Sequence, residues 1–130
     1  MSVVALVVDD SMVIRHTVCR FLEERGYAVE SASNGLEAVA ALKRVSPGLV
    51  ITDLDMPEMS GSEFISVLKS KPETANIPIV IVTARSKGYD TSETRAQFTI
   101  FKDIDIEQQL ETALASTMHG RAAKGQASAR

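Results

Sequence analysis

Short runs of consecutive apolar residues alternate along the chain with stretches whose apolar residues recur every three or four positions. Short β-branched runs are typical of strands buried on both faces, and the wider spacing is typical of amphipathic helices. The pattern predicts strands at Val3–Val8, Tyr27–Ala32, Leu49–Thr52, Ile77–Val82 and Ile100–Phe101. Because helices lie between most of these strands, we expect an α/β fold, with a parallel five-stranded sheet that carries helices on both faces.

Four helices are predicted, and each follows a polar residue that can cap its first turn. These capping residues are Ser11, Asn34, Ser60 and Asp105, and Gln108 stands at the capping-box position after the last of them. Gly26 and Pro47-Gly48 are expected to end the first and second helices. The helices carry the apolar side chains Ile14, Val18, Phe21, Leu22, Leu36, Val39, Ala40, Leu42, Phe64, Ile65, Val67, Leu68, Ile106, Leu110, Ala113, Leu114 and Met118.

Two stretches depart from this regular pattern. Arg85–Gln97 is polar apart from Tyr89 and Ala96, and it is rich in residues that favour turns over helix interiors. We predict that it holds no stable full-length helix in the resting protein. His119–Arg130 is rich in Ala, Gly, Ser and Gln and carries three basic and no acidic side chains. It is predicted to be a disordered basic tail, with an electrostatic docking arm as the alternative.

Composition and charge narrow the class of protein. With 130 residues and 45% hydrophobic content, the chain can form one domain with a substantial core. The net charge of −3 gives no reason to expect general affinity for nucleic acid. No apolar run approaches the roughly 20 residues of a membrane span, and no cationic signal-peptide start precedes the first strand. The single cysteine, Cys19, suits a reducing compartment, so we expect a cytoplasmic protein without membrane contacts.

Acidic residues follow directly after two of the predicted strands. Asp9 and Asp10 close the first strand, and Asp53 closes the third. In an open α/β sheet the ligand crevice lies beyond the carboxyl ends of the strands, so these carboxylates should converge there. Three carboxylates repel one another unless a cation joins them, and oxygen ligands suit Mg²⁺. The sequence therefore predicts a metal-assisted site that handles phosphate.

Motifs at the ends of successive predicted strands point to a family. They are Val7-Val8-Asp9-Asp10-Ser11, Asp53-Leu54-Asp55-Met56-Pro57-Glu58-Met59-Ser60-Gly61, Val82-Thr83-Ala84 and Phe101-Lys102. Together they resemble the receiver domains of bacterial two-component response regulators, in particular the chemotaxis type. The resemblance covers roughly Val3 to Met118, so residues 1–118 are assigned to a receiver domain. It implies a doubly wound, flavodoxin-like sheet of strand order 2-1-3-4-5.

The resemblance also implies roles for the acidic residues. Asp53 would be the phosphoacceptor and would form an aspartyl phosphate. Asp10 and Asp53 would bind Mg²⁺ together with the backbone carbonyl of Asp55, and Asp9 would act through water or by orienting the other ligands. The side chain of Asp55 would face the phosphoryl group, where it could orient an attacking water or repel the phosphate.

Three further residues are implied to contact the phosphoryl group. Thr83 would bond a phosphoryl oxygen and move inward on activation, and Ala84 belongs to the same contact. Lys102 would pair with Asp53 or with the phosphoryl group as a point charge. Pro57 and Gly61 would shape the loop after the third strand and admit the third helix.

The chain departs from the family pattern near the last strand. Receivers usually have proline after the lysine, whereas Asp103 stands here. A cis bond before a non-proline residue costs roughly 2.5–4 kcal/mol, so a trans bond is expected. The position of the aromatic switch residue is held by Thr99, and the stretch from Thr83 to Lys102 is shorter than usual. We therefore expect an intact phosphorylation site and an altered output face, in which phosphorylation orders Arg85–Gln97.

These inferences predict a single-domain response regulator rather than an enzyme. It would accept a phosphoryl group on Asp53 from a phosphohistidine of a kinase or phosphotransfer protein, and would signal through altered protein contacts. One alternative is a pseudo-receiver that binds partners without phosphorylation, but Asp10, Asp53 and Lys102 are all present. The other is a haloacid-dehalogenase-type phosphatase, which Asp53-Leu54-Asp55 imitates, although that reading gives Asp9-Asp10 no role.

Overall fold

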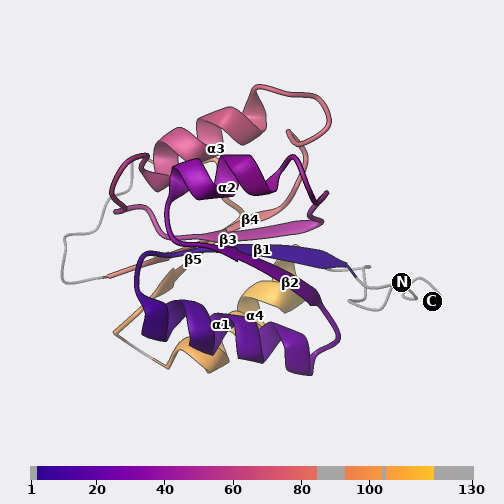
Figure 1. Cartoon of the computed structure of the whole chain (residues 1–130). Coiled ribbons are helices and arrows are strands. Elements are labelled where there is room, and N and C mark those ends of the chain that lie inside the picture. Colours follow the sequence, from indigo (N-terminus) through magenta and orange to yellow (C-terminus); the bar gives the residue numbers. More distant parts are fainter. Residues whose placement is uncertain (1–2, 85–92, 104, 119–130) are drawn as a thin grey trace.

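A parallel five-stranded sheet lies between two helical layers in the computed structural model, which describes residues 3–84, 93–103 and 105–118 (Figure 1). Its strands are β1 (Val4–Val8), β2 (Ala28–Ala32), β3 (Leu49–Thr52), β4 (Ile79–Thr83) and β5 (Phe98–Phe101). They are hydrogen-bonded in the order β2-β1-β3-β4-β5, and every neighbouring pair is parallel. The fold class and the strand order predicted from the sequence are confirmed.

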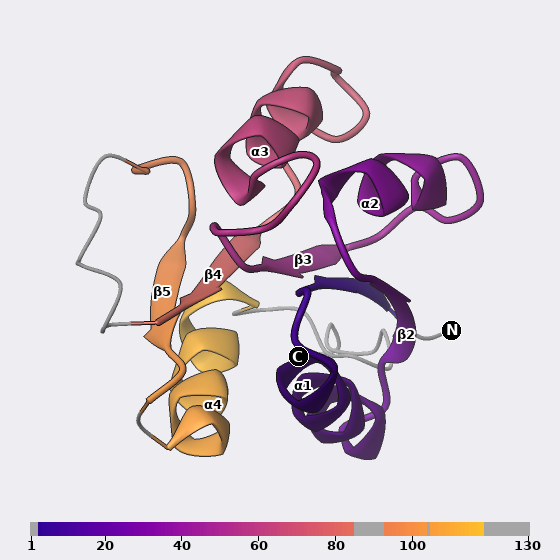
Figure 2. The same ribbon diagram turned by 60° about the vertical axis from the view of Figure 1, so that its left-hand side comes forward.

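In the part of the chain that the structure describes, two helices cover each face of the sheet. The helices α1 (Met12–Glu24) and α4 (Ile106–Thr117) lie on one face, and α2 (Gly35–Ala41) and α3 (Gly61–Lys69) lie on the other (Figure 2). Successive side chains of a strand point to opposite faces. In β1, Val7 therefore packs in the core under α1 and α4, whereas Leu6 packs in the core under α2 and α3.

The predicted capping residues begin all four helices. Ser11, Asn34, Ser60 and Asp105 each accept a hydrogen bond from the backbone N–H three residues further on. The reciprocal capping box lies at α3, where the Glu63 side chain reaches back to Ser60, whereas at α4 the structure shows only the bond from the Gln108 N–H to Asp105. Gly26 follows α1 with a φ of 93°, a left-handed conformation that suits glycine.

The prediction for the second helix was partly right about its apolar face and wrong about its end: Val39 and Leu42 pack against the core, whereas Leu36 and Ala40 are exposed. Small residues, Gly35, Ala38 and Ala41, face the core, while Leu36 is 50% exposed. A Cβ on Gly35 would lie 2.7 Å from the side chain and the backbone oxygen of Met59, so only glycine allows α2 to approach that close. The helix ends at Ala41, well before Pro47, because the backbone then tightens into turns bonded three residues back.

The ends of the last two strands also differ from the prediction. β4 begins at Ile79 rather than Ile77, since Pro78 has no N–H to offer a neighbouring strand. β5 begins at Phe98 and includes Thr99, and all four of its residues pair with β4. Pairing with a buried neighbour therefore extends a strand that the local sequence predicts to be short.

The connection between β4 and β5 contains no helix within residues 93–97. Arg95 holds this part to α3, donating to the Ser66 hydroxyl at 2.8 Å and pairing with Glu93. Residues 93–97 are thus held to α3 without forming a helix, and the absence of a helix agrees with the prediction as far as this part is described. The predictions for residues 85–92 and for the tail 119–130 fall outside the described residues, as does any ordering of 85–92 on phosphorylation. Among the helices described, none has the length and apolar character needed to cross a membrane.

Candidate functional site

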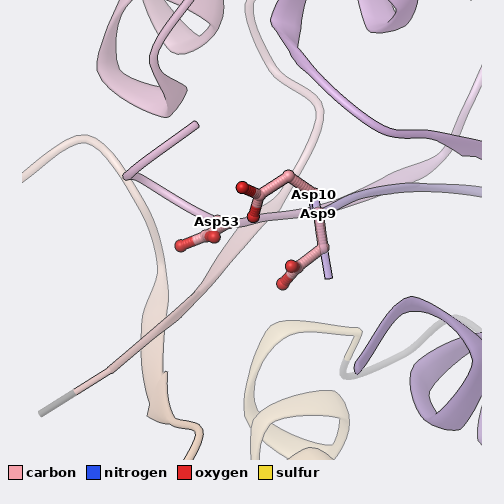
Figure 3. Close-up of side chains that lie close together, drawn as sticks. All are labelled: Asp9, Asp10 and Asp53. Atoms are coloured by element: carbon pink, nitrogen blue, oxygen red, sulfur yellow. The ribbon is translucent and has the colours of Figure 1, made fainter. Parts of the chain in front are cut away.

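Pairing of β1 with β3 brings the acidic residues together. The two strands run in parallel with Val8 opposite Thr52, so Asp9 and Asp53 leave the sheet at the same edge. The Asp53 N–H donates to the Val8 carbonyl at 2.8 Å, which fixes the two strand ends relative to each other. Figure 3 shows Asp9, Asp10 and Asp53 grouped at this edge.

Carboxylate oxygens of these three residues all lie within 4.8 Å of one another. Asp9 and Asp53 are only 2% and 3% exposed, whereas Asp10 is exposed to solvent. The convergence predicted from the sequence is confirmed. The cluster therefore combines two buried acids with one that faces solvent, an arrangement that suits the binding of an ion.

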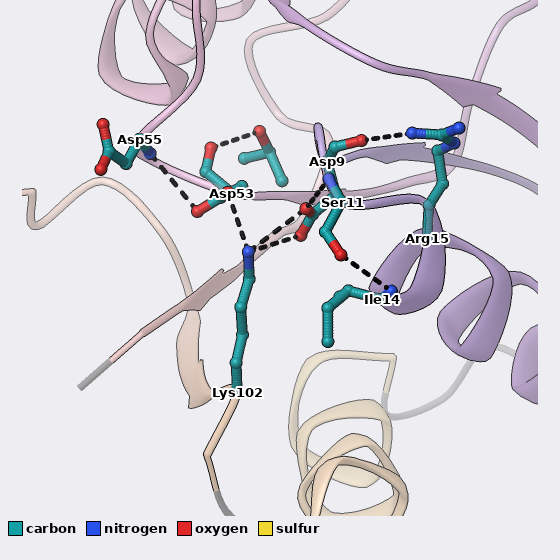
Figure 4. A network of polar contacts seen from close by, with 8 residues as sticks. Asp9, Ser11, Ile14, Arg15, Asp53, Asp55 and Lys102 are labelled. Atoms are coloured by element: carbon teal, nitrogen blue, oxygen red, sulfur yellow. Dashed lines mark hydrogen bonds and ion pairs between the residues drawn. The ribbon is translucent and has the colours of Figure 1, made fainter. Parts of the chain in front are cut away.

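Lys102 is the cation that faces these acids in the described structure. Its Nζ lies 2.9 Å from Oδ2 of Asp53, and 3.2 Å and 3.1 Å from Oδ1 and Oδ2 of Asp9 (Figure 4). Oδ2 of Asp9 is nevertheless buried without a hydrogen bond from any described residue. One ammonium does not balance three carboxylates, and a hard divalent cation with its bound water would satisfy both the charge and this oxygen. The donor set therefore fits Mg²⁺.

Burial is the largest influence on the pKa values of the two buried acids, Asp9 and Asp53. Burial raises the pKa of Asp53, although the hydrogen bond and charge of Lys102 lower it. Burial also raises the pKa of Asp9, against the hydrogen bond from the Ser11 N–H, and the nearby Asp53 charge raises it further. Burial alone would lower the pKa of Lys102, but Asp53 and Asp9 outweigh it and raise the net pKa. The folded site therefore holds its protons more tightly than the unfolded chain does.

These shifts predict a pH-dependent penalty on stability. The pKa of Asp53 is raised on folding, so stability is lost as pH rises from about 3.9 through that raised pKa. Asp53→Asn removes this term and relieves Asp9, so the variant should become increasingly more stable than the wild type over that range. Urea unfolding of both proteins between pH 4 and 8 without metal measures the difference. A constant difference, or one that shrinks with rising pH, would contradict the assignment.

Backbone contacts hold the acids in place, and several come from residues that the sequence analysis missed. Arg15 donates from Nη1 to the Asp9 carbonyl at 2.7 Å, and the Thr52 hydroxyl donates to the Asp53 carbonyl at 2.8 Å. The Ser11 N–H donates to Oδ1 of Asp9 at 2.8 Å. A signal for Arg15 existed, since it lies one turn after the Ser11 cap and its long side chain can reach back to the strand end.

Gly61 allows α3 to begin directly against the strand end that carries Asp53. A Cβ at this position would lie 2.0 Å from the Asp53 carbonyl oxygen and 2.7 Å from the Leu54 Cα. Both atoms belong to the backbone and cannot turn aside, so any larger residue would push the loop away from the site. The prediction that Gly61 admits the third helix is confirmed.

The remaining predicted residues lie on or near β3, β4 and β5. Asp55 is exposed, and its N–H donates to Oδ1 of Asp53 at 3.3 Å. Thr83 ends β4, Ala84 follows it, and both are half-buried. The Thr83 carbonyl accepts a hydrogen bond from the Lys102 N–H at 2.8 Å. These contacts join the ends of β4 and β5.

The two departures from the family pattern are also placed. Thr99 lies within β5 opposite Ile81 of β4, so it belongs to the sheet pairing rather than to a loop. The described residues contain no cis peptide bond, and Lys102 and Asp103 are therefore joined in trans as predicted.

The family model described as the response regulator receiver domain matches residues 5–115. The chain belongs to this family. Protein PilH of Pseudomonas aeruginosa is 32% identical over 110 residues, which cover 82% of the chain and 91% of PilH. The structure of the chemotaxis response regulator CheY4 of Vibrio cholerae matches with a TM-score of 0.74 and 30% identity, covering 86% of this chain and 96% of that one.

Some relatives are longer than this chain. The response regulator Rre1 of Synechocystis sp. is 37% identical over 93 residues, which cover 66% of the chain but 40% of Rre1. The shared part is thus the receiver domain, a signalling module of two-component systems. Receiver domains bind Mg²⁺ at an acidic pocket and interact with histidine kinases or phosphotransfer proteins, and this chain has an acidic cluster formed by Asp9, Asp10 and Asp53.

Proposed function

We propose that the chain is a response regulator that accepts a phosphoryl group on Asp53 from a phosphohistidine of a kinase or phosphotransfer protein. The observation that carries this proposal is the buried Asp53 carboxylate, bonded to Lys102 at 2.9 Å beside the carboxylates of Asp9 and Asp10. A nucleophile, a fixed ammonium and a metal-binding acid pair are the groups that phosphoryl transfer to a carboxylate needs.

The residues of the site divide the work of transfer. A carboxylate oxygen of Asp53 forms a bond to phosphorus while the N–P bond of the phosphohistidine breaks, and the electron pair of that bond stays on the imidazole nitrogen. Lys102 moves its contact from the carboxylate to the phosphoryl oxygens and stabilises their charge. Asp10, Asp53 and the Asp55 carbonyl would hold Mg²⁺, and Asp9 would act through water or by orienting these ligands. When bound, this ion offsets negative charge at the site of transfer.

Transmission would begin at the ends of β4 and β5. Thr83 and Ala84 lie at the end of the strand that pairs with β5, and the Thr83 carbonyl holds the Lys102 backbone. A phosphoryl group on Asp53 that draws in both Thr83 and Lys102 would shift these strand ends together. Since Thr99 offers no aromatic ring, the signal would leave through the altered contacts of this edge rather than through a swinging aromatic side chain.

The proposal is tested by incubating the protein with acetyl phosphate and Mg²⁺. We expect one base-labile phosphoryl group per chain, detected by mass spectrometry, and little or no labelling when a chelator is present during the incubation. A phosphatase would instead release phosphate in many turnovers from a generic phosphate ester, and a pseudo-receiver would stay unlabelled. Either of those results would overturn the proposal. Transfer from a phosphorylated histidine phosphotransfer protein then identifies the physiological class of donor.

A further inference from the structure

The end of β5 lies at an open edge of the sheet, where backbone groups lack a neighbouring strand. Among the described residues, β5 is the last strand in the order and pairs with β4 alone. The Lys102 N–H donates towards β4, to the Thr83 carbonyl at 2.8 Å. Because backbone groups of successive residues in a strand point to opposite sides, the N–H and carbonyl of Phe101 point to the open edge. Such an edge normally needs cover.

The side chain of Gln109 supplies that cover. Its Oε1 accepts a hydrogen bond from the Phe101 N–H at 3.1 Å, and its Nε2 donates to the Phe101 carbonyl at 2.8 Å. The same Nε2 lies 3.3 Å from the carbonyl of Asp105, the residue that caps α4. One carboxamide thus takes the place of a peptide group in a further strand and joins the end of β5 to the start of α4.

The bonds of Gln109 are made to residues on both sides of Lys102 in the sequence. Phe101 precedes Lys102, and Asp105 follows it by three residues. The Lys102 N–H is held on the other side by the Thr83 carbonyl. Asp103 is not a proline and its bond to Lys102 is trans, so no proline ring restrains the chain after the lysine. The hydrogen bonds at Phe101, Lys102 and Asp105 restrain this segment without a proline.

We propose that Gln109 is a positioning residue for Lys102. Its carboxamide fixes the strand end from which the Lys102 side chain extends to Asp53 at 2.9 Å and to Asp9 at 3.1 Å. The effect of Gln109 on phosphoryl transfer rests on the proposed function. The effect of Gln109 on the position of the Lys102 side chain does not, and it can be measured without any phosphorylation.

The test compares Gln109→Leu with Gln108→Leu, which makes the same chemical change one residue earlier on an exposed side chain. Acetylation of Lys102 by a limiting amount of acetic anhydride, measured by peptide mass spectrometry, reports how firmly the ammonium is held. Lys69, whose Nζ donates to the Ala75 carbonyl, is the internal reference. We expect Lys102 to react several times faster in Gln109→Leu and at the wild-type rate in Gln108→Leu. Circular dichroism at the same temperature establishes that both variants are folded.

Phosphorylation kinetics provide the second measurement. At saturating acetyl phosphate and Mg²⁺, the maximal rate of Gln109→Leu should fall about tenfold to a hundredfold, as expected when a charged group is displaced by about an ångström. The acetyl phosphate concentration at half-maximal rate should stay unchanged, because Gln109 does not touch the donor. A purely structural role would leave the maximal rate of the folded protein unaltered.

Gln109→Glu is a control for effects that come from the apolar leucine side chain rather than from the loss of the hydrogen bonds. It keeps the length and one acceptor but loses both donors and sets a carboxylate against two carbonyl oxygens, so it should behave like Gln109→Leu. If the wild type is not phosphorylated, the proposed function fails, and the acetylation rates alone decide the role of Gln109. Unchanged Lys102 reactivity in both Gln109 variants would overturn the inference, whatever the phosphorylation result.

Discussion

Replacing Asp53 by asparagine should abolish phosphorylation of the chain. Asparagine has nearly the same shape and can still accept a hydrogen bond from Lys102, so the fold should persist. An amide oxygen is not a nucleophile towards phosphorus, and the labelling rate should therefore drop by at least about a thousandfold. Labelling with acetyl phosphate and Mg²⁺, followed by intact-mass measurement, checks the expectation.

Asp55→Asn is the matched control for this variant. It makes the same change two residues away, on an exposed side chain, and leaves the backbone carbonyl in place. It should still take up one phosphoryl group, with a changed lifetime if the side chain faces the phosphoryl group as the family resemblance implies. Full labelling of Asp53→Asn together with loss of labelling in Asp55→Asn would move the phosphoacceptor to Asp55.

The sequence predicted the position of the acids because strand ends are set by local patterns. Val4–Val8 and Leu49–Thr52 are short β-branched runs, and each is followed at once by an acidic residue. Parallel pairing of two such runs leaves no freedom in where Asp9 and Asp53 emerge. The clustering of Asp9, Asp10 and Asp53 is thus a direct consequence of the sheet topology. Topology is the part of the fold that the hydrophobic pattern determines best.

Contacts made by long side chains across the fold were not predictable in the same way. Gln109 lies one turn into a helix, and nothing in its neighbourhood indicates that its carboxamide reaches the edge of β5. The inward face of α2 depends on the approach of Met59 to Gly35, which belongs to a different element. In both cases the decisive partner is distant in the sequence, and local pattern carries no information about it.

The site joins two opposing requirements. Asp9 and Asp53 are buried, which raises their pKa, yet the proposed function requires both to be ionised. Lys102 offsets part of this cost through its contacts with both carboxylates. The remaining repulsion destabilises the metal-free fold and is released when a cation binds. Repulsion among the same carboxylates is therefore expected both to destabilise the metal-free protein and to favour the binding of a cation.

Addition of Mg²⁺ should accordingly raise the melting temperature of the protein. An ion that binds only the folded state stabilises it by about 2.7 kcal/mol when its concentration is 100 times the dissociation constant. For a domain of this size that corresponds to an increase of roughly 8–13 °C, and each further tenfold in concentration adds about half as much again. Thermal unfolding followed by circular dichroism across a MgCl₂ titration, at constant ionic strength, measures the shift.

Asp10→Ala separates this specific binding from general screening of charge. Asp10 is exposed and contributes one of the three clustered carboxylates, so its removal should raise the metal-free melting temperature and abolish most of the Mg²⁺ response. Asp55→Ala removes an equal charge nearby but keeps the backbone carbonyl, and it should retain the response. An undiminished response in Asp10→Ala would place the ion elsewhere on the protein. Equal loss in both variants would mean that Mg²⁺ acts by screening alone.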